Sequence, residues 1–381
     1  MIDSEVIALT PQKFDVAVCV GRFQVFHNGH LALVRRALAG GTTCVVVIGS
    51  AFQARTPKNP FTWDERAAMI RAAVPEADRE RLRFLPVRDY YDTPRWVAAV
   101  RQGVAGFHPQ QEGRPPASVT LVGHLKDATS VYLHDFPGWT LDAVPEQGRI
   151  DSSALRDAWF GSGGQSTDRV DVALSALTSQ VPASTLDFMR AWSALPYFVD
   201  LAGEWRALRD EKARWAGSPY PPMFVTVDAV VRCGDKVLLI RRGRAPGKGH
   251  YAVPGGFLEQ RETVYQSALR ELEEETGLRL LGGDMQHALK AVQVFDHPGR
   301  SQRGRVITHA HLFDLGPRRP PEVEAADDAA SADWVGIGEL LALEDQFHDD
   351  HFHILDFFFG LTTHEAGAKD AAAQMTTPEK S

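Results

Sequence analysis

The chain has 381 residues, which is enough for two or three domains, and 44% of them are hydrophobic and 24% are charged. This balance is that of an ordinary globular protein and excludes collagen-like, coiled-coil and wholly disordered chains. Acidic residues outnumber basic ones by 49 to 41, which gives a formal net charge of −8, and no long basic run offers a surface to duplex nucleic acid. We therefore expect no nucleic-acid partner.

The cysteines and the apolar runs indicate where in the cell the protein resides. Cys19, Cys44 and Cys233 lie far apart without C-x-x-C spacing, so we expect neither a disulfide framework nor a cysteine-rich zinc site. The first twelve residues lack the basic region and the apolar core of a secretion signal. The longest apolar runs, such as Val45–Ile48, are too short to span a bilayer. The sequence predicts a cytoplasmic protein without a membrane partner and leaves a homo-oligomer open.

From residue 14 to about residue 159, β-branched runs alternate with helical stretches, which is typical of a parallel sheet covered by helices. The expected strands are Asp15–Val20, Thr43–Gly49, Arg83–Val87, Ser118–Gly123 and Thr140–Val144. Thr62 and Glu65 have the spacing of a capping box, and Thr93 precedes a first-turn proline. These patterns predict an α/β domain over residues 14–195.

The second half has a different pattern. The proline-rich segment Ser218–Pro222 precedes two strand-like runs, Phe224–Val231 and Lys236–Ile240, with a turn at Gly234 between them. We expect a helical linker over residues 196–220 and a strand-rich α+β domain over residues 221–362. The composition of residues 363–381 predicts a disordered tail.

A glycine and two histidines follow the first expected strand. Gly21 lets the backbone approach a ligand, and the helix expected after it presents free N–H groups to a phosphate. His27 and His30 can donate hydrogen bonds to phosphoryl oxygens, which suits nucleotidyl transfer because that reaction needs positioning and charge stabilisation. Taken alone, however, an H-x-x-H pair is more often two surface histidines.

The whole stretch Gly21–His30 resembles the G-R-F-Q-P-F-H-x-G-H signature of the nucleotidylyltransferase superfamily, in particular the archaeal-type nicotinamide mononucleotide adenylyltransferases. Val25 stands where the signature has proline. The resemblance implies a Rossmann-like domain that binds ATP and nicotinamide mononucleotide. It implies two catalytic histidines and three substrate-binding residues, which are His27, His30, Gly21, Arg22 and Phe23.

A second segment, Ile150–Arg156, resembles the I-S-x-T-x-x-R motif of the same family, in which hydroxyls and an arginine hold the ATP phosphates. Ser153 supplies a substrate-binding hydroxyl and Arg156 a catalytic phosphate clamp, whereas Asp151 replaces a serine and leaves the role of that position open. The segments at 49–66 and 123–139 also resemble this family and follow expected strand ends, where open α/β sheets bind ligands. Candidates there for the mononucleotide pocket, with packing as an equal alternative, are Asn59, Lys126, Asp127 and Trp139.

The second half contains a complete Nudix box, G-x5-E-x7-R-E-U-x-E-E-x-G-U, where U is a bulky apolar residue. A chance match has a probability of roughly 10⁻⁶ over the chain. The matching residues are Gly256, Glu262, Arg270, Glu271, Leu272, Glu274, Glu275, Gly277 and Leu278.

The box predicts a helix over residues 263–276 that ends at Gly277 and carries Glu271, Glu274 and Glu275 on one face. Three like charges destabilise a bare helix, and a hard divalent cation with oxygen ligands removes the repulsion. We expect these glutamates to bind Mg²⁺, with Mn²⁺ as an alternative, and two of them, Glu274 and Glu275, to be catalytic. Arg270 is expected to pair with a glutamate.

Segments near residues 220–228 and 295–305 resemble the ADP-ribose pyrophosphatase branch of the Nudix hydrolases, which makes Arg300 and Arg305 candidates for substrate binding. The histidine- and aspartate-rich segment Phe347–His353 has the composition of a metal site. We expect a structural or substrate-rim role for it, because the Nudix helix already supplies ligands.

Together, the two motif sets resemble the bacterial bifunctional nicotinamide mononucleotide adenylyltransferase/Nudix hydrolases over about residues 14–361. The resemblance implies an enzyme that makes NAD and pyrophosphate from ATP and nicotinamide mononucleotide, and that hydrolyses ADP-ribose to AMP and ribose 5-phosphate with Mg²⁺. One alternative is an adenylyltransferase for another phosphorylated acceptor, fused to a Nudix hydrolase of different substrate. Another is a nucleotide-sensing Nudix regulator, which the intact box and the lack of a basic helix-turn-helix disfavour.

Overall fold

The computed structural model describes residues 13–109, 113, 115–124, 134–144, 150–162, 167–279 and 282–363. The chain divides into two compact units. The first contains residues 1–51, 61–159 and 166–194, and the second contains residues 52–60, 160–165 and 195–381. Of the tail expected to be disordered, all but residue 363 lies outside the described residues.

A five-stranded parallel sheet forms the centre of the first unit, in the order β3-β2-β1-β4-β5. The five strands predicted from the sequence are confirmed as β1 Phe14–Gly21, β2 Gly41–Ile48, β3 Leu82–Pro86, β4 Val119–Gly123 and β5 Thr140–Ala143. The strand order reverses at β1, which pairs with β2 on one side and β4 on the other. Ligands of open α/β sheets bind at such a point, beyond the carboxyl ends of the strands.

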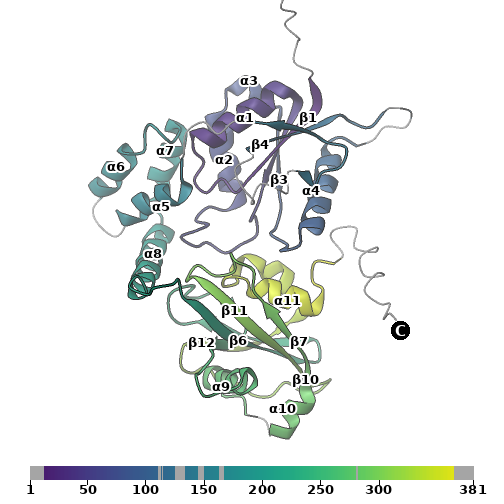
Figure 1. Ribbon diagram of the computed structural model, residues 1–381, viewed down its shortest axis with the longest axis vertical. Helices are drawn as coiled ribbons and strands as arrows, with labels where there is room; N and C mark the ends of the chain where they lie inside the picture. Colours follow the sequence, from purple (N-terminus) through teal and green to yellow (C-terminus); the bar gives the residue numbers. More distant parts are fainter. Residues whose placement is uncertain are drawn as a thin grey trace, which may run out of the picture. The chain divides into compact units, whose positions relative to one another are not determined.

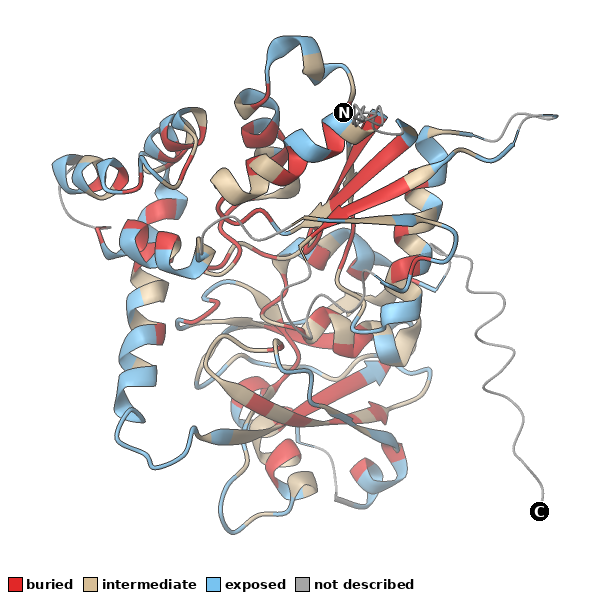
Figure 2. Ribbon diagram, turned by 45° about the horizontal axis from the view of Figure 1, so that its top comes forward, coloured by how far each residue is buried: buried red, intermediate tan, exposed pale blue. Residues whose placement is uncertain are grey.

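Helices cover both faces of this sheet (Figure 1). Helices α1 Asn28–Gly40 and α2 Trp63–Ala73 lie on one face, and α4 Thr93–Phe107 lies on the other. The capping box predicted at Thr62 is present at the start of α2. The remaining helices of this part are α3 Glu76–Arg79, α5 Ser152–Gly161, α6 Thr167–Ser175 and α7 Ala183–Trp192. Buried residues follow the strands, as Figure 2 shows.

The second unit contains a mixed sheet with the order β10-β11-β6-β7-β12, to which β8 and β9 add on β7 and β6. Its strands are β6 Met223–Cys233, β7 Lys236–Arg242, β8 Tyr251–Ala252, β9 Gly255–Phe257, β10 Leu289–Phe295, β11 Arg305–Asp314 and β12 Ala329–Gly336. Its helices are α8 Pro196–Arg214, α9 Val264–Thr276, α10 Gly282–Ala288, the 3₁₀ helix η2 Ile337–Gln346 and α11 His351–Phe359. The predicted fold class, a Rossmann-like α/β domain and an α+β Nudix domain, is confirmed.

Two segments that precede residue 221 belong to the second unit. Helix α8 was expected as a linker, yet the Glu204 carboxylate accepts a hydrogen bond from the Gly247 amide at 3.1 Å. Residues 52–60 lie between β2 and α2 in sequence, yet the Lys58 ammonium donates to the Gly299 carbonyl at 3.3 Å. With residues 160–165, the second unit is assembled from three stretches of chain. None of the helices in the described part of the chain has the length and apolar character needed to cross a bilayer.

Candidate functional site

The first candidate site lies where β1 ends and α1 begins, at the reversal point of the sheet. His27 caps α1, and its Nδ1 atom accepts a hydrogen bond from the backbone amide of His30 at 3.4 Å. The two imidazole rings stack with their centroids 3.7 Å apart. Both rings thus stand beside the free N–H groups of a helix start, where the helix dipole favours an anionic ligand.

Gly21 and Phe23 shape the turn before these histidines. Phe23 is buried with a left-handed backbone, φ 54°, and its ring meets the His30 ring edge-on at 5.0 Å. A Cβ atom at Gly21 would lie 2.8 Å from the Phe23 ring, so the turn requires glycine at this position. Val25, which stands in place of the signature proline, is fully buried.

The second motif meets the first across 132 residues of sequence. Arg156 donates hydrogen bonds to the backbone carbonyl of Gln24 and, at 3.2 Å, to the Ser153 hydroxyl. Burial, and then the nearby charge of Arg22, lower the pKa of Arg156 to about 10. Two guanidinium groups held this close favour an anionic ligand. The Asp151 carboxylate accepts the Ser153 amide at 2.8 Å, which gives this departure from the motif a helix-capping role.

Arg66 joins the ends of β1 and β2, a role that the sequence motifs do not reveal. Its side chain is fully buried and donates to the backbone carbonyls of Arg22 at 2.7 Å, Gly49 at 2.8 Å and Ser50 at 3.1 Å. Burial lowers the pKa of Arg66 to about 10. Its signal in the sequence is an arginine on the apolar face of an amphipathic helix, which by itself fits many roles.

The structure describes two of the four remaining candidates of the first site. Trp139 stacks on Phe136 with centroids 4.7 Å apart. Asn59 lies in the second unit, where its Nδ2 donates to Gln53 at 2.6 Å and its buried Oδ1 has no hydrogen-bond partner among the described residues. Two further candidates lie outside the described residues, Lys126 and Asp127.

The second candidate site is built on α9. As the sequence predicted, this helix starts after Thr263 and ends at Gly277, whose φ of 63° is left-handed. Leu272 and Leu278 of the box are buried in the core beneath it. A Cβ atom at Gly256 would lie 2.4 Å from the Glu271 carboxylate, so the box glycine is needed for this close approach.

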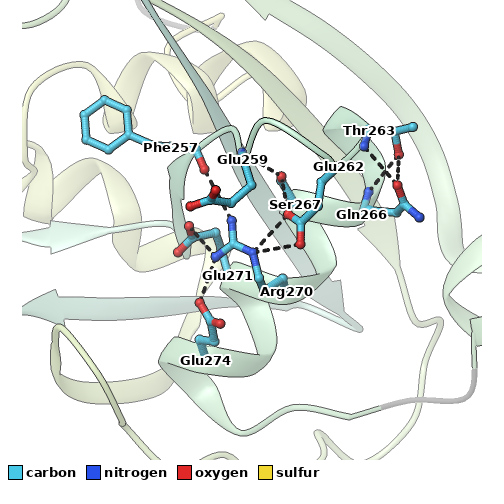
Figure 3. A network of polar contacts seen from close by, with 9 residues as sticks. All are labelled: Phe257, Glu259, Glu262, Thr263, Gln266, Ser267, Arg270, Glu271 and Glu274. Atoms are coloured by element: carbon cyan, nitrogen blue, oxygen red, sulfur yellow. Dashed lines mark hydrogen bonds and ion pairs between the residues drawn. The ribbon is translucent and has the colours of Figure 1, made fainter.

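Arg270 lies at the centre of the box (Figure 3). Its Nε donates to Glu262 at 3.0 Å, and its Nη1 donates to Glu271 at 2.9 Å and to Glu274 at 2.8 Å. Its Nη2 donates to the Phe257 carbonyl at 3.3 Å. The ion pairing predicted for Arg270 is therefore present with three glutamates, and the guanidinium holds their carboxylates together.

Glu275 lies deeper than these residues. It is 4% exposed, and its carboxylate accepts the Gly255 amide at 2.9 Å. Burial raises the pKa of Glu275 to about 8, and the neighbouring charge of Glu271 contributes. Burial also raises the pKa of Glu271, with a contribution from Glu274. Buried carboxylates that repel one another are stabilised by a cation.

The fit of a metal ion can be judged from the donor atoms. Within the described ranges, no three histidine, cysteine, aspartate or glutamate side chains converge as a metal-binding group, and Phe347–His353 is part of those ranges. On α9, Arg270 lies among the carboxylates instead. The donor chemistry nevertheless fits a hard divalent cation, because Glu271, Glu274 and Glu275 offer oxygen atoms only.

The arginines near the end of β10 differ in their environment. Arg300 is 6% exposed and forms a two-point ion pair with Asp350, at 2.9 and 2.8 Å. Arg305 donates to the Asp296 carbonyl. Arg303, which the motifs did not single out, lies 3.6 Å from a carboxylate oxygen of Glu211 on α8.

The two sites define two classes of enzyme in one chain, a nucleotidyltransferase and a Nudix hydrolase. The family model for cytidylyltransferase-like proteins matches residues 18–103, and that for the NUDIX domain matches residues 222–358. The nicotinamide/nicotinic acid mononucleotide adenylyltransferase of Acinetobacter baylyi is 32% identical over 198 residues, which cover 51% of this chain and 95% of that protein. The ADP-ribose pyrophosphatase of Methanocaldococcus jannaschii is 36% identical over 116 residues, which cover 30% of this chain and 63% of that protein.

Similarity over nearly the whole chain comes from a solved structure. The crystal structure of a bifunctional NMN adenylyltransferase/ADP ribose pyrophosphatase from Francisella tularensis has a TM-score of 0.81 and 32% identity, and the match covers 91% of this chain and 99% of that one. A structure of such an enzyme from the same organism, complexed with AMP and a Mn ion, also has a TM-score of 0.81, with 31% identity. The chain belongs to the family of bifunctional NMN adenylyltransferase/ADP ribose pyrophosphatase enzymes.

Proposed function

We propose that this chain is a bifunctional enzyme of NAD metabolism. Its first unit transfers the adenylyl group of ATP to nicotinamide mononucleotide, and its second unit hydrolyses ADP-ribose to AMP and ribose 5-phosphate. The observation that carries the proposal is the match of 91% of the chain to the bifunctional Francisella structure, with a complete motif set in each half. The three cysteines, all buried free thiols, fit a reducing cytoplasm.

In the first reaction, a phosphate oxygen of nicotinamide mononucleotide attacks the α-phosphorus of ATP, and pyrophosphate leaves. His27 and His30 donate hydrogen bonds to the oxygens that gain charge in the transition state. Arg22 and Arg156 neutralise the phosphates, with the Ser153 hydroxyl beside them. Gly21 and Phe23 bind substrate at the end of β1, and Trp139 of the same unit, with Lys126 and Asp127, belongs to the mononucleotide pocket.

In the second reaction, water attacks phosphorus in the diphosphate of ADP-ribose. Glu271, Glu274 and Glu275 would hold Mg²⁺ or Mn²⁺, which when bound supplies an activated water and offsets phosphate charge. Arg270 orients Glu271 and Glu274 through the contacts described above. Glu274 or Glu275 accepts the proton of the attacking water, and Arg300 and Arg305 are assigned to substrate binding.

Chromatographic analysis of products tests both halves. ATP with nicotinamide mononucleotide should give NAD and pyrophosphate, and ADP-ribose with Mg²⁺ should give AMP and ribose 5-phosphate. Adenylyl transfer only to another acceptor, such as a pantetheine or flavin phosphate, would contradict the first half. Intact ADP-ribose after prolonged incubation would contradict the second.

A further inference from the structure

The side chain of Gln24 is buried in the first unit, although it carries a polar amide. It is 4% exposed, and both ends of its amide contact the backbone of Phe61. The Nε2 atom donates to the Phe61 carbonyl at 2.8 Å, and the Oε1 atom accepts a hydrogen bond from the Phe61 amide at 3.1 Å. Because both ends are paired with one residue, the amide holds the backbone of Phe61 against the segment Gly21–His30.

Phe61 in turn contacts helix α5. Its ring stacks on the Trp159 ring with the centroids 5.5 Å apart, and Phe61 is 2% exposed. Trp159 lies three residues after Arg156 on α5, so the two side chains lie on the same side of the helix. Arg156 donates a hydrogen bond to the backbone carbonyl of Gln24. The contacts therefore join three segments in a closed loop, and Gln24 touches both of the others.

The position of Gln24 matters because it lies between two groups assigned to the phosphates. His27 is three residues further along the same segment, and the Arg156 guanidinium is bound to the Gln24 carbonyl. A displacement of Gln24 would therefore change the distance between His27 and Arg156. Since an error of about 1 Å in such a geometry can cost about 10²-fold in rate, the orientation of Gln24 affects catalysis although its amide carries no charge.

We propose that Gln24 is a positioning residue for adenylyl transfer. Its side chain binds Phe61 and thereby fixes the backbone carbonyl that orients Arg156. This inference rests on the proposed function of the first unit and extends it to a residue that has no reacting group. It also explains why the segment that contains Phe61 affects the site, since this segment connects Gln24 to α5.

A double-mutant cycle in the full chain tests the proposal. Gln24→Met is of similar length and volume but removes both hydrogen bonds to Phe61, so kcat for NAD synthesis should fall about tenfold. Arg156→Ala removes the group through which Gln24 acts. In that background Gln24→Met should change kcat by less than about twofold, because residues that act as a unit are not additive. A residue that serves only stability would lower kcat by the same factor in both backgrounds.

A second variant separates the hydrogen bonds from the shape of the side chain. Gln24→Glu keeps the length and the acceptor for the Phe61 amide, but when ionised it presents an acceptor to the Phe61 carbonyl as well. It should therefore also slow NAD synthesis. Gln102→Met is the matched control and should make NAD at the parental rate, since Gln102 is exposed on α4. ADP-ribose hydrolysis should be unchanged throughout, because all these positions lie in the first unit.

The melting temperature of each variant checks folding, and Gln24→Glu takes the place of Gln24→Met in the cycle if the latter does not fold. Parental kcat in both Gln24 variants would overturn the proposal, as would equal losses in the wild-type and Arg156→Ala backgrounds. A wild type that makes no NAD would contradict the proposed function instead. The same cycle, measured as ATP affinity by calorimetry, would then still decide whether Gln24 acts through Arg156.

Discussion

The two candidate sites carry opposite charges, although both are assigned substrates that contain phosphate. The first contains positive and hydrogen-bond-donating groups, namely two stacked histidines at a helix start and Arg156, which feels the charge of Arg22. The second gathers glutamates around a single arginine and keeps an excess of negative charge. A diphosphate can approach the second only after a cation offsets that charge, whereas the first already carries groups that attract an anion. Loss of charge should therefore affect the two sites differently.

The largest expected effect is at the carboxylates. Glu274→Gln or Glu275→Gln should reduce ADP-ribose hydrolysis by on the order of 10³-fold, because each removes a metal-directed carboxylate or base at nearly constant shape. Rates at saturating Mg²⁺ measure the effect. Glu273→Gln is the matched control, since Glu273 is on the same helix but pairs with Arg279 instead of Arg270. Parental hydrolysis in both box variants would show that neither carboxylate acts in the reaction.

The histidines should give the next largest effect. His27→Ala or His30→Ala should slow NAD synthesis by about 10²-fold, because each removes a donor aimed at the transferring phosphate. Initial rates with ATP and nicotinamide mononucleotide measure it, and ADP-ribose hydrolysis should persist. His108→Ala is a control from the same unit. His108 directly follows the last residue of α4, and its Nε2 atom lies 3.3 Å from the Thr43 hydroxyl oxygen. Near-normal adenylyl transfer in both variants would show that the two histidines do not contribute to catalysis.

The stability of an isolated second unit should depend on whether the fragment contains α8. A fragment that starts at Pro219 lacks α8, whose Leu201 and Leu208 are buried and whose Glu204 holds Gly247. A fragment that starts at Leu195 keeps these contacts, and its melting temperature should exceed that of the shorter fragment by several degrees. Both should melt below the full chain, because both lack residues 52–60. Equal melting temperatures for the two fragments would show that α8 does not stabilise the second unit and is a linker.

The smallest predicted effect concerns Glu204 and pH. Burial raises its pKa from 4.5 to about 7, the Gly247 amide opposes this, and Asp349 adds to it. Such a carboxyl contributes stability that is fully present below about pH 4.5 and is lost as pH rises through about 7. Glu204→Gln keeps an acceptor for the amide and removes the charge, so it should raise the melting temperature at pH 8 more than at pH 5. A shift of equal size at both pH values would contradict this cause.

The sequence predicted the parts of the fold that local patterns determine. Three strands of the first sheet, β1, β2 and β4, are rich in β-branched residues, and α9 has a capping box at one end and a glycine at the other. The motif residues could be found because their spacing within one short segment is fixed. The assignment of α8 and of residues 52–60 to the second unit could not be decided from the sequence, because each depends on contacts between residues far apart in sequence. The role of Arg66, which lies in a segment that resembles the family, was not predicted for the same reason, since its partners are backbone carbonyls that any residue provides.

The independence of the two active sites can be tested by measuring both activities on His27→Ala, on Glu275→Gln and on the double variant. We expect that the first variant loses NAD synthesis and keeps ADP-ribose hydrolysis, that the second does the reverse, and that the double variant loses both. Folding should be checked by the melting temperature of each variant. Loss of both activities in either correctly folded single variant would contradict the account.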